Sequence, residues 1–454
     1  MYTAGRIFGT DGVRGKANHY PMTVEIALAL GRAAGYVFRK AFKKSRVVIG
    51  KDTRLSCYMF ENALVAGFCS MGVDTLMVGP LPTPGVAFIT RAYRADAGVV
   101  ISASHNSYED NGIKIFSGDG YKLPDTLQDE IEKLMKDCMF DQCIPPDNEI
   151  GKNFKVNDAD GRYIEFAKGT FPRKMTLEGL KIVLDCANGA AHRVAPLIFK
   201  ELDADIFSYS INPNGLNINE NCGSLYPDLI QKAVKQHHAH IGIALDGDAD
   251  RVILVDELGS IIDGDVILAI CARDLKENGL LESNTIVTTV MANFGMIKAM
   301  EALGINVVQA QVGDRYVIQE MLRFDSNLGG EQSGHMIFSD YNTTGDGLVT
   351  ALQVLRIMIE KRKSLSELAS FIEKYPQICI NVKVKEKPDL KTLLEVQTAM
   401  QRGSDKLRGD GRLLVRYSGT EATCRVMVEA KDETVVQDVA NEIAAAIKKS
   451  IGEN

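Results

Sequence analysis

The sequence predicts an α/β protein in which three related α/β domains with mixed sheets and a smaller C-terminal α+β domain surround a central cleft. Three observations predict this fold. The chain has 454 residues, which is about three times the roughly 150 residues of one domain. A strand–helix–strand pattern occurs three times along the chain, and the tail shows a different order of elements.

Each copy of the pattern starts with an apolar run that is rich in β-branched residues. The three runs open the segments RVVIGKDTRLS at Arg46, KIVLDCANGAA at Lys181 and TIVTTVMANFG at Thr285. A segment with helical spacing of apolar residues follows in each copy, and then a second apolar run. Strand, helix and strand in this order predict a parallel pair with a crossover connection.

Each copy then contains one more short strand, which runs into a polar loop. The three segments are AGVVISASHN from Ala97, IGIALDGDADR from Ile241 and NLGGEQSGH from Asn327. Ligands in open α/β sheets bind beyond the carboxyl ends of the strands. We therefore expect the three loops to face one cleft.

The tail is predicted to be a small α+β domain and not a fourth copy. We expect strands at 378–384, 412–416 and 425–430 and helices at 390–400 and 433–448. The expected domains are 1–153, 154–255, 256–373 and 374–454. We expect a hinge near Lys374–Pro376, before the last domain.

The composition argues against several classes of partner. The net charge of −7 disfavours nucleic acid as the main partner, because binding to phosphate backbones needs a basic surface. No segment approaches the ~20 apolar residues of a membrane helix, and the segment Met1–Arg14 lacks the apolar core of a signal peptide. The nine cysteines are odd in number and scattered, which is typical of reduced thiols in a cytoplasmic protein.

The segment DGDADR places Asp246, Asp248 and Asp250 at alternate positions directly after a predicted strand. In an extended loop these carboxylates would share one side, and three oxygen donors without His or Cys suit Mg²⁺. An EF-hand is the main alternative, but its sixth position needs glycine and is Arg251 here. A solvated acidic turn is the other alternative, and mutual repulsion of the three carboxylates weakens it.

Three further motifs carry polar groups next to glycines. RYSGTE, from Arg416, joins an arginine and two hydroxyls, which suits a phosphate group as well as it suits a tight turn between strands. GGEQSGH, from Gly329, offers groups that suit the hydroxyls of a sugar, and a plain turn at a strand end is the alternative. FGTDGVRG, from Phe8, places three glycines around Asp11 and Arg14.

Ser104 precedes His105 in the loop SASHN and fits a hydrolase nucleophile, a phosphate carrier or an ordinary loop serine. A hydrolase is disfavoured, because an adjacent histidine cannot readily act as the base and the chain has no G-x-S-x-G segment. A cation site, an anion site and a polyol site together favour phosphoryl transfer on a sugar, with Ser104 as the covalent carrier. Lys114 and Arg14 would add positive charge.

In type and order, these motifs resemble those of the α-D-phosphohexomutase superfamily, and the resemblance covers essentially the whole chain. FGTDGVRG looks like the opening signature, SASHN like the phosphoserine loop and DGDADR like the Mg²⁺ loop. GEQSGH is similar to the sugar loop, RYSGTE to the phosphate loop, and VGDRYV (Val312–Val317) to a segment of one subgroup. The resemblance implies four domains, of which the first three are alike.

The resemblance also implies roles for single residues. It makes Ser104 the phosphorylated residue and a metal ligand together with Asp246, Asp248 and Asp250. The substrate-binding candidates are Glu331, Ser333, Arg416, Ser418, Gly419, Thr420 and, as a helper, Arg425. The catalytic candidates are Ser104, His105, Arg14, Lys114, Arg251 and His335, with Lys114 and His335 as the general acid and base.

The implied reaction interconverts glucosamine 6-phosphate and glucosamine 1-phosphate on the route to UDP-N-acetylglucosamine. Phosphorylated Ser104 would donate to the free sugar oxygen, and the other phosphate of the resulting bisphosphate would return to Ser104. One Mg²⁺ per chain and a hexose 1,6-bisphosphate primer are the implied cofactors. The implied partner is a phosphorylated amino sugar, with a homodimer allowed and with no nucleic acid or membrane.

Two positions depart from the pattern of the superfamily. Ser107 and Ala422 stand where proline is usual, which would loosen two loops without removing a chemical group. Three other functions stay open: a phosphomannomutase/phosphoglucomutase of the same superfamily, a non-catalytic sugar-phosphate binder and a metal-dependent phosphatase. The opening motif and Gln332 favour the amino-sugar reaction over the first of these.

Overall fold

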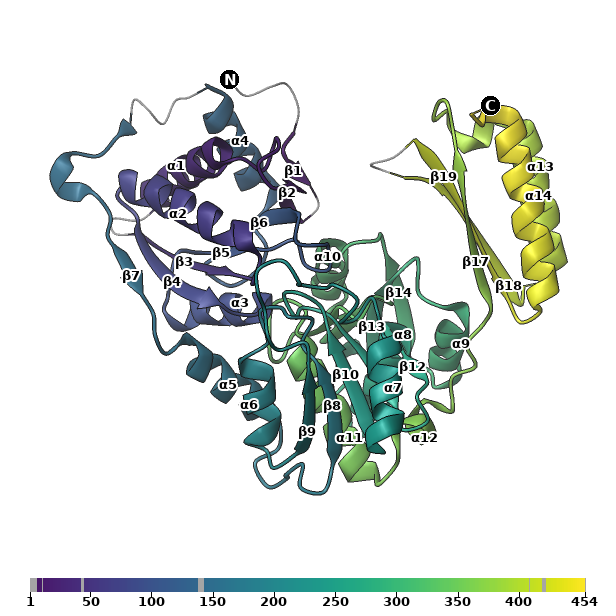
Figure 1. Ribbon diagram of the computed structural model, residues 1–454. Helices are drawn as coiled ribbons and strands as arrows, with labels where there is room; N and C mark the ends of the chain where they lie inside the picture. The colour runs from purple at the N-terminus through teal and green to yellow at the C-terminus, as the bar shows by residue number, and fades with distance from the viewer. Residues whose placement is uncertain are drawn as a thin grey trace. The chain divides into compact units, whose positions relative to one another are not determined.

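The computed structural model describes residues 6–9, 11–41, 45–137, 143–407, 409–418 and 422–453 (Figure 1). The chain divides into one unit made of Met1–Val290 and Ile305–Ser370 and a second unit made of Met291–Gly304 and Phe371–Asn454. None of the described helices combines the length and the apolar character that a membrane span requires. The eight cysteines in the described part of the chain are free thiols.

The first repeat of the larger unit forms a seven-stranded mixed sheet with the order β1-β2-β6-β5-β3-β4-β7. The strands are β1 (Phe8–Gly9), β2 (Gly12–Lys16), β3 (Arg46–Lys51), β4 (Asp74–Pro80), β5 (Ala97–Ile101), β6 (Asp110–Ser117) and β7 (Asn153–Lys155). The helices are α1 (Val24–Ala41), α2 (Leu55–Ser70), α3 (Thr83–Ala92), α4 (Asp125–Asp137) and the 3₁₀ turn η2 (Asp147–Glu149). Strand β3 pairs in parallel with both β4 and β5, whereas β6 runs antiparallel to β5.

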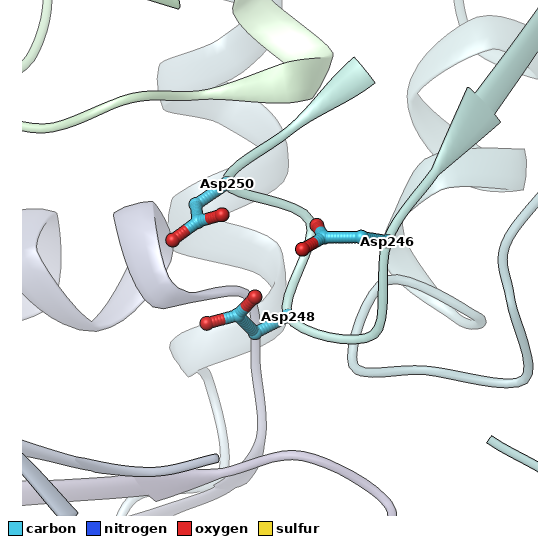
Figure 2. A group of neighbouring side chains, drawn as sticks. All are labelled: Asp246, Asp248 and Asp250. Atoms are coloured by element: carbon cyan, nitrogen blue, oxygen red, sulfur yellow. The ribbon is translucent and has the colours of Figure 1, made fainter. Parts of the chain in front are cut away.

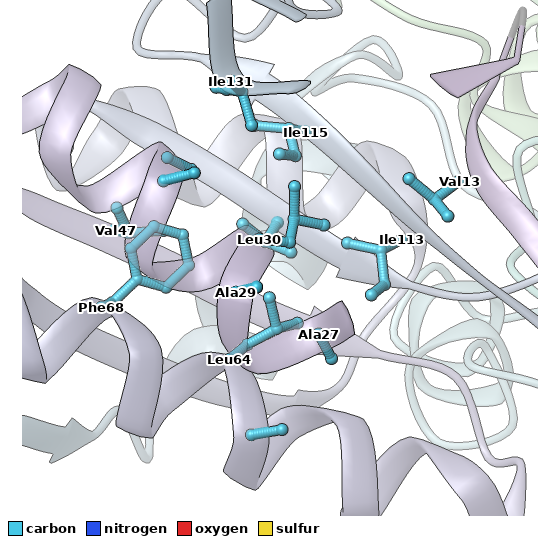
Figure 3. Packing of buried hydrophobic residues seen from close by; sticks show 14 of the residues in the cluster. Val13, Ala27, Ala29, Leu30, Val47, Leu64, Phe68, Ile113, Ile115 and Ile131 are labelled. Carbon is cyan, nitrogen blue, oxygen red and sulfur yellow. The ribbon is translucent and has the colours of Figure 1, made fainter. Parts of the chain in front are cut away.

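Helices α1 and α2 form the main core of this repeat together with the sheet. Leu30 of α1 and Leu64 and Phe68 of α2 are fully buried beside strand residues (Figure 3). The helices approach so closely that a Cβ atom on Gly67 would lie 2.5 Å from the carbonyl oxygen of Leu28. Each buried side chain of this size stabilises the fold by roughly 1.5–3 kcal/mol.

The second repeat forms a five-stranded sheet with the order β12-β11-β10-β8-β9. Its strands are β8 (Lys181–Asp185), β9 (Asp205–Tyr209), β10 (Ile241–Leu245), β11 (Val252–Asp256) and β12 (Ile261–Ile262), and its helices are α5 (Ala159–Gly169), α6 (Val194–Lys200) and α7 (Asp228–His237). Every residue of β10 and β11 is buried, as expected for strands in the middle of a layered sheet.

The third repeat forms a four-stranded sheet with the order β14-β13-β15-β16. Its strands are β13 (Thr285–Thr289), β14 (Asn306–Ala310), β15 (Leu328–Gly330) and β16 (Met336–Phe338). The helices are α8 (Gly264–Glu277), α10 (Asp314–Phe324), α11 (Gly347–Lys361) and α12 (Leu365–Ala369), with the 3₁₀ turn η3 (Glu282–Asn284).

The three sheets share one four-strand core, which confirms the internal repeat. The matching orders are β4-β3-β5-β6, β9-β8-β10-β11 and β14-β13-β15-β16. In each core the first three strands are parallel and the fourth is antiparallel to the third. The three polar loops therefore connect equivalent strands: β5 to β6, β10 to β11 and β15 to β16.

The second unit contains an antiparallel sheet with the order β17-β19-β18. Its elements are α9 (Phe294–Ala302), β17 (Gln377–Lys383), η4 (Leu390–Thr392), α13 (Leu394–Leu407), β18 (Gly411–Tyr417), β19 (Thr423–Ala430) and α14 (Glu433–Ile451). The predicted α+β tail is thus confirmed, but the helix expected from residue 390 begins at Leu394. Residues 390–392 form a separate 3₁₀ turn because the Asp389 side chain accepts the backbone N–H of Lys391.

Candidate active site

Three buried carboxylates converge in the loop between β10 and β11. Each of Asp246, Asp248 and Asp250 offers one oxygen, and these oxygens lie within 4.8 Å of one another (Figure 2). The loop is a tight turn and not the extended segment that the sequence suggested: Ala249 has φ 56° and its N–H donates to the carbonyl oxygen of Asp246 at 3.1 Å. The turn, rather than an extended alternation, makes the carboxylates converge.

The oxygens of this cluster fit a hard cation. Oδ1 of Asp248 and Oδ1 of Asp250 are buried and accept no hydrogen bond from the described residues. Burial raises the pKa of Asp246 well above its ordinary value, and the neighbouring carboxylates Asp248 and Asp250 raise it further. A divalent cation would satisfy the two orphan oxygens and offset this repulsion, and an all-oxygen donor set suits Mg²⁺ or a similar hard ion.

Ser104, in the β5–β6 loop, lies against this cluster. Its Oγ donates to Oδ2 of Asp246 at 2.6 Å, and the residue is 1% exposed. Ser104 has φ 53°, a left-handed conformation that residues with a Cβ rarely adopt. Strained backbone of this kind persists only where the surrounding contacts fix it, and it is often found at functional sites.

Lys114, on β6, supplies the positive charge nearest to the cluster. Its Nζ lies 2.9 Å from Oδ2 of Asp248, 3.3 Å from Oδ2 of Asp250 and 3.4 Å from Oδ2 of Asp11. Burial lowers the pKa of Lys114, but the three carboxylates outweigh burial and raise the pKa above its ordinary value. The ammonium group is therefore charged at neutral pH.

A chain of alternating charges extends from Lys114 to the third repeat. Asp11 pairs with Arg14 and with Lys122, and Nζ of Lys122 also lies 2.5 Å from Oδ2 of Asp314, the first residue of α10. Burial alone would raise the pKa of Asp11, but Lys114, Lys122 and Arg14 lower it far below its ordinary value. The predicted Arg14 thus joins the site through Asp11, whereas the sequence did not single out Lys122.

His105 contacts an arginine and not a carboxylate. Its Nδ1 accepts Nη1–H of Arg251 at 2.8 Å and lies 3.5 Å from Oγ of Ser104. The pKa of His105 is lowered to about 4, chiefly by burial and also by the neighbouring Arg251 and Arg14. The ring is neutral at pH 7 with its proton on Nε2, so it can donate to an anion, and it is not oriented as the base of a hydrolase triad.

Arg251 and His335 connect the second and third loops. Their backbones form an isolated β-bridge, and the His335 ring lies 3.6 Å from both Asp250 and Asp314. Nε2 of His335 accepts the N–H of Gly345 at 3.2 Å. Burial lowers the pKa of His335, but the adjacent carboxylates, Asp250 foremost, raise it overall. At 2% exposure the ring is packed inside the site.

The remaining residues of the third loop face different surroundings. Oε1 of Glu331 accepts the N–H of Gly313 at 3.0 Å, so the predicted sugar loop contacts the start of the VGDRYV segment. Ser333 is exposed at the tip of the loop. Among the described residues, neither side chain forms a hydrogen bond with the three aspartates.

The second unit holds the predicted phosphate loop. Arg416 of β18 and Arg425 of β19 lie directly opposite each other in register, where like charges repel. Nearby, Ser418 is buried, and its carbonyl oxygen accepts Nζ–H of Lys387 at 2.7 Å. Three cationic groups around one strand end suit an anion. Gly419 and Thr420 lie outside the described residues.

Besides Lys122, sequence reasoning missed three further residues that contact the site. Oγ1 of Thr83, at the start of α3, donates to Oδ2 of Asp248 at 2.7 Å. Arg54 and Asn219 donate to the backbone of the Ser104 loop. Thr83 and Arg54 each follow the carboxyl end of a parallel strand, and that position was the available signal. Asn219 lies in an irregular segment that carried no such signal.

The chain matches the four domains of one family along most of its length. The matches are phosphoglucomutase/phosphomannomutase domain I at residues 5–142, domain II at 161–259, domain III at 263–375 and the C-terminal domain at 380–446. A phosphoglucosamine mutase of Protochlamydia amoebophila is 63% identical over 447 residues, which cover 98% of each chain.

Solved structures share the fold at low sequence identity. A phosphoglucomutase/phosphomannomutase family protein of Burkholderia thailandensis has a TM-score of 0.81, with 24% identity and 99% of both chains covered. The N-acetylphosphoglucosamine mutase of Aspergillus fumigatus, in complex with GlcNAc-6P and magnesium, has a TM-score of 0.65, with 18% identity over 97% of this chain and 95% of that one. By its four domain matches and its full-length identity, the chain belongs to the phosphoglucomutase/phosphomannomutase family and, within it, to the phosphoglucosamine mutases.

Proposed function

We propose that the chain interconverts glucosamine 6-phosphate and glucosamine 1-phosphate through a phosphorylated serine and a bisphosphorylated sugar. The observation that carries this proposal is the 2.6 Å hydrogen bond between Oγ of Ser104 and Asp246, which puts a buried hydroxyl at the edge of a cation site. The 63% identity to a phosphoglucosamine mutase supports the amino sugar as substrate. The product would enter UDP-N-acetylglucosamine synthesis in the cytoplasm.

Mg²⁺, one per chain, is the proposed cation. Asp246, Asp248, Asp250 and phosphorylated Ser104 would hold it, in agreement with the orphan oxygens of Asp248 and Asp250. When bound, the ion neutralises charge on the phosphoryl group and polarises its oxygens. The structure of the Aspergillus fumigatus relative contains magnesium and a sugar phosphate, which agrees with this assignment.

In the proposed reaction, Ser104 carries the phosphoryl group. The bond between phosphorus and Oγ of Ser104 breaks while a bond to the free sugar oxygen forms, and the proton of the sugar hydroxyl passes to a base. The second half-reaction runs in reverse from the other phosphate and restores phosphorylated Ser104. A hexose 1,6-bisphosphate is the proposed primer, because it can phosphorylate an unmodified serine.

The side chains around Ser104 have separate proposed roles. Lys114, Arg14 and Arg251 add positive charge, and neutral His105 offers an N–H donor for phosphate oxygens. Lys114 and His335 are the proposed acid–base pair. Because its neighbouring carboxylates raise its pKa, Lys114 is protonated and would enter the reaction as the acid of this pair.

The sugar and its second phosphate would be held by the two remaining loops. Glu331 and Ser333 would bind hydroxyls that both orientations of the sugar present. Arg416, Ser418, Gly419 and Thr420, with Arg425 as a helper, would bind whichever phosphate is not reacting. The two opposed arginines support an anion at this place.

The domain limits and the assembly also stay proposals. We propose domains at 1–153, 154–255, 256–373 and 374–454, a hinge near 374–376 and, as one allowed state, a homodimer. The division of the chain after Ser370 agrees with a boundary in this region.

A direct assay tests the proposal. Purified protein is incubated with Mg²⁺, a hexose 1,6-bisphosphate primer and glucosamine 6-phosphate, glucose 6-phosphate or mannose 6-phosphate, and each 1-phosphate product is quantified. We expect the largest kcat/KM with glucosamine 6-phosphate. A larger value with glucose or mannose 6-phosphate would favour the sister activity, release of inorganic phosphate would indicate a phosphatase, and absence of turnover would indicate a binder.

A further inference from the structure

Two side chains outside the motifs of the proposed reaction, Arg54 and Asn219, donate hydrogen bonds to the backbone around Ser104. The loop needs such support, because Ser104 has a left-handed φ of 53°. The hydrogen bond from Ser104 N–H to Oγ of Ser102, at 2.9 Å, is one internal contact of the loop. Further hydrogen bonds to its backbone come from the side chains of Arg54 and Asn219.

The guanidinium group of Arg54 donates hydrogen bonds to the backbone of this loop. Nη2 donates to the carbonyl oxygen of Asn106 at 2.6 Å and to that of Ser104 at 3.1 Å, and Nε lies 3.4 Å from the carbonyl oxygen of Ser107. Nη1 pairs with Asp52, which also accepts the hydroxyl of Ser102 at 2.6 Å. The side chains of Arg54 and Asp52 are both 0% exposed. The pair is therefore neutral overall and directs a rigid fork of donors at the loop.

Asn219 holds the same two carbonyl groups from the second repeat. Its Nδ2 donates to the carbonyl oxygens of Ser104 and Asn106, both at 2.9 Å, and the residue is 7% exposed. Gly247, between two of the clustered aspartates, lies so close that a Cβ there would meet the carbonyl oxygen of Ser104 at 2.6 Å and Nδ2 of Asn219 at 2.8 Å. The second repeat thus contacts the serine loop beside the carboxylate cluster.

We propose that Arg54 and Asn219 are positioning residues that jointly fix the carbonyl groups of Ser104 and Asn106, so that Oγ of Ser104 keeps its place at the carboxylate cluster during phosphoryl transfer. Neither side chain contacts Oγ. The need is greatest when Ser104 is phosphorylated, because a group of about −1.5 to −2 charge then faces three carboxylates. Because Arg54 and Asn219 donate to the backbone and not to Oγ, they can fix the loop whether or not Ser104 is phosphorylated. The inference rests on the proposed function.

Two substitutions and their combination test this inference. Arg54→Lys keeps the charge beside Asp52, but its single nitrogen has three N–H donors and cannot bond to Asp52 and to three carbonyl groups at once. Asn219→Ala removes one neutral donor. Because a displacement of about 1 Å at a reacting group lowers the rate on the order of 10²-fold, we expect kcat to fall by that factor in each variant. KM for glucosamine 6-phosphate should stay unchanged, because neither side chain is proposed to touch the sugar. Arg356→Lys is the matched control. Nη2 of Arg356 lies 2.6 Å from Oδ2 of the buried Asp274, and this ion pair does not involve the Ser104 loop.

The double variant adds a second criterion. Since both residues bond to the same two carbonyl groups, the loss of kcat in Arg54→Lys/Asn219→Ala should be clearly smaller than the product of the single losses. A kcat of Arg54→Lys equal to that of Arg356→Lys, a raised KM with kcat unchanged, or a fully multiplicative loss would each overturn the inference. Where Arg54→Lys does not fold, Asn219→Ala decides by the same kcat and KM criteria.

Phosphorylation of Ser104 separates this inference from the proposed function. Intact mass after incubation with glucose 1,6-bisphosphate measures how fast the serine accepts a phosphoryl group, whatever sugar the enzyme isomerises. We expect slower phosphorylation in both single variants than in the parent and in Arg356→Lys. Equal rates in all four proteins would overturn the positioning role even where the mutase assay fails for the parent.

Discussion

Oγ of Ser104 lies 2.6 Å from Oδ2 of Asp246, although 142 positions separate the two residues in the chain. The two side chains come from equivalent loops of different repeats, after β5 and after β10. Repetition of one four-strand core therefore places similar loops at one site, and each loop has acquired different chemistry. The hydroxyl and the three carboxylates meet because the repeats dock, not because they are close in sequence.

Ser104→Ala should abolish turnover without unfolding the protein. The substitution removes the only atom that can carry the phosphoryl group in the proposed reaction, so kcat should fall by a factor on the order of 10⁴ or more. Alanine has the same backbone restrictions as serine at φ 53°, so the loss of stability should be limited to about 0.5–1.5 kcal/mol for the missing hydrogen bond to Asp246. Intact mass before and after incubation with glucose 1,6-bisphosphate should show one added phosphate in the parent and none in the variant.

The exposed Ser107, three positions further along the loop, provides the control. Ser107→Ala keeps the carbonyl group that faces Arg54 and should retain both the added phosphate and turnover. Phosphate retained in Ser104→Ala would show that another residue is the carrier.

Asp248→Asn should remove the stabilisation that Mg²⁺ gives to the fold. A ligand that binds only the folded state stabilises it by about 2.7 kcal/mol at a concentration 100 times its Kd, which appears as a raised Tm. Oδ1 of Asp248 is buried without a hydrogen-bond partner among the described residues, and neutralising this carboxylate removes charge that the ion needs. Differential scanning fluorimetry with and without Mg²⁺ should show a shift in the parent and little or none in the variant.

Asp256→Asn is the matched control for this measurement, because Asp256 is 3% exposed and lies on the hairpin that follows the cluster. Its own stability loss does not matter, since the Mg²⁺-induced shift is compared within each protein. Equal shifts in the parent and Asp248→Asn would place the cation elsewhere.

Lys114→Met should lower both stability and turnover. Methionine keeps most of the side-chain volume but leaves Asp11, Asp248 and Asp250 without the ammonium group between them. Removing one partner from a buried ion pair costs roughly 3–5 kcal/mol, and Mg²⁺ should recover part of this loss by replacing the positive charge. Thermal unfolding with and without Mg²⁺ measures the first effect, and the mutase assay with saturating Mg²⁺ measures the second.

Lys168→Met separates the role of Lys114 from the general loss of an ion pair. Lys168 also bridges two carboxylates, Glu165 at 2.5 Å and Glu201 at 2.6 Å, but at the surface. We expect that variant to keep full turnover and nearly full stability, as exposed pairs contribute little. Unchanged turnover in Lys114→Met would remove the lysine from the reaction.

The sequence predicted the strands and helices that follow from local residue patterns. It missed the contacts that form only when one repeat packs against another. The β-branched runs at Arg46, Lys181 and Thr285 predicted the parallel strands correctly, because buried strands are read from apolar runs. The alternating aspartates predicted a cation site, although the turn at Ala249 that makes them converge could not be read from alternation. The bonds of Asn219 and Lys122 reach other repeats, and a single sequence contains no signal for such long-range contacts.

Stability should depend on pH through Asp346, the residue that caps α11. Its carboxylate accepts the N–H groups of Leu348 and Val349 and the hydroxyl of Tyr163, but burial raises its pKa from 3.8 to about 6. The folded state therefore binds the proton more tightly than the unfolded state does. This group makes the fold more stable as the pH falls from above 6 to below 4, by about 3 kcal/mol in total.

Asp346→Asn tests this dependence, because asparagine retains an acceptor for the helix cap but does not titrate. Urea denaturation at pH 7 and at pH 4 should show that the parent gains stability relative to the variant at the lower pH. Asp405→Asn, at an exposed carboxyl on α13, is the control, and its difference from the parent should change far less between the two pH values. If the free energies of unfolding of the parent and of Asp346→Asn changed by the same amount between the two pH values, the pKa of Asp346 would be the same in the folded and unfolded states. The carboxylate would then have a stabilising partner other than Tyr163 and the helix N-terminus.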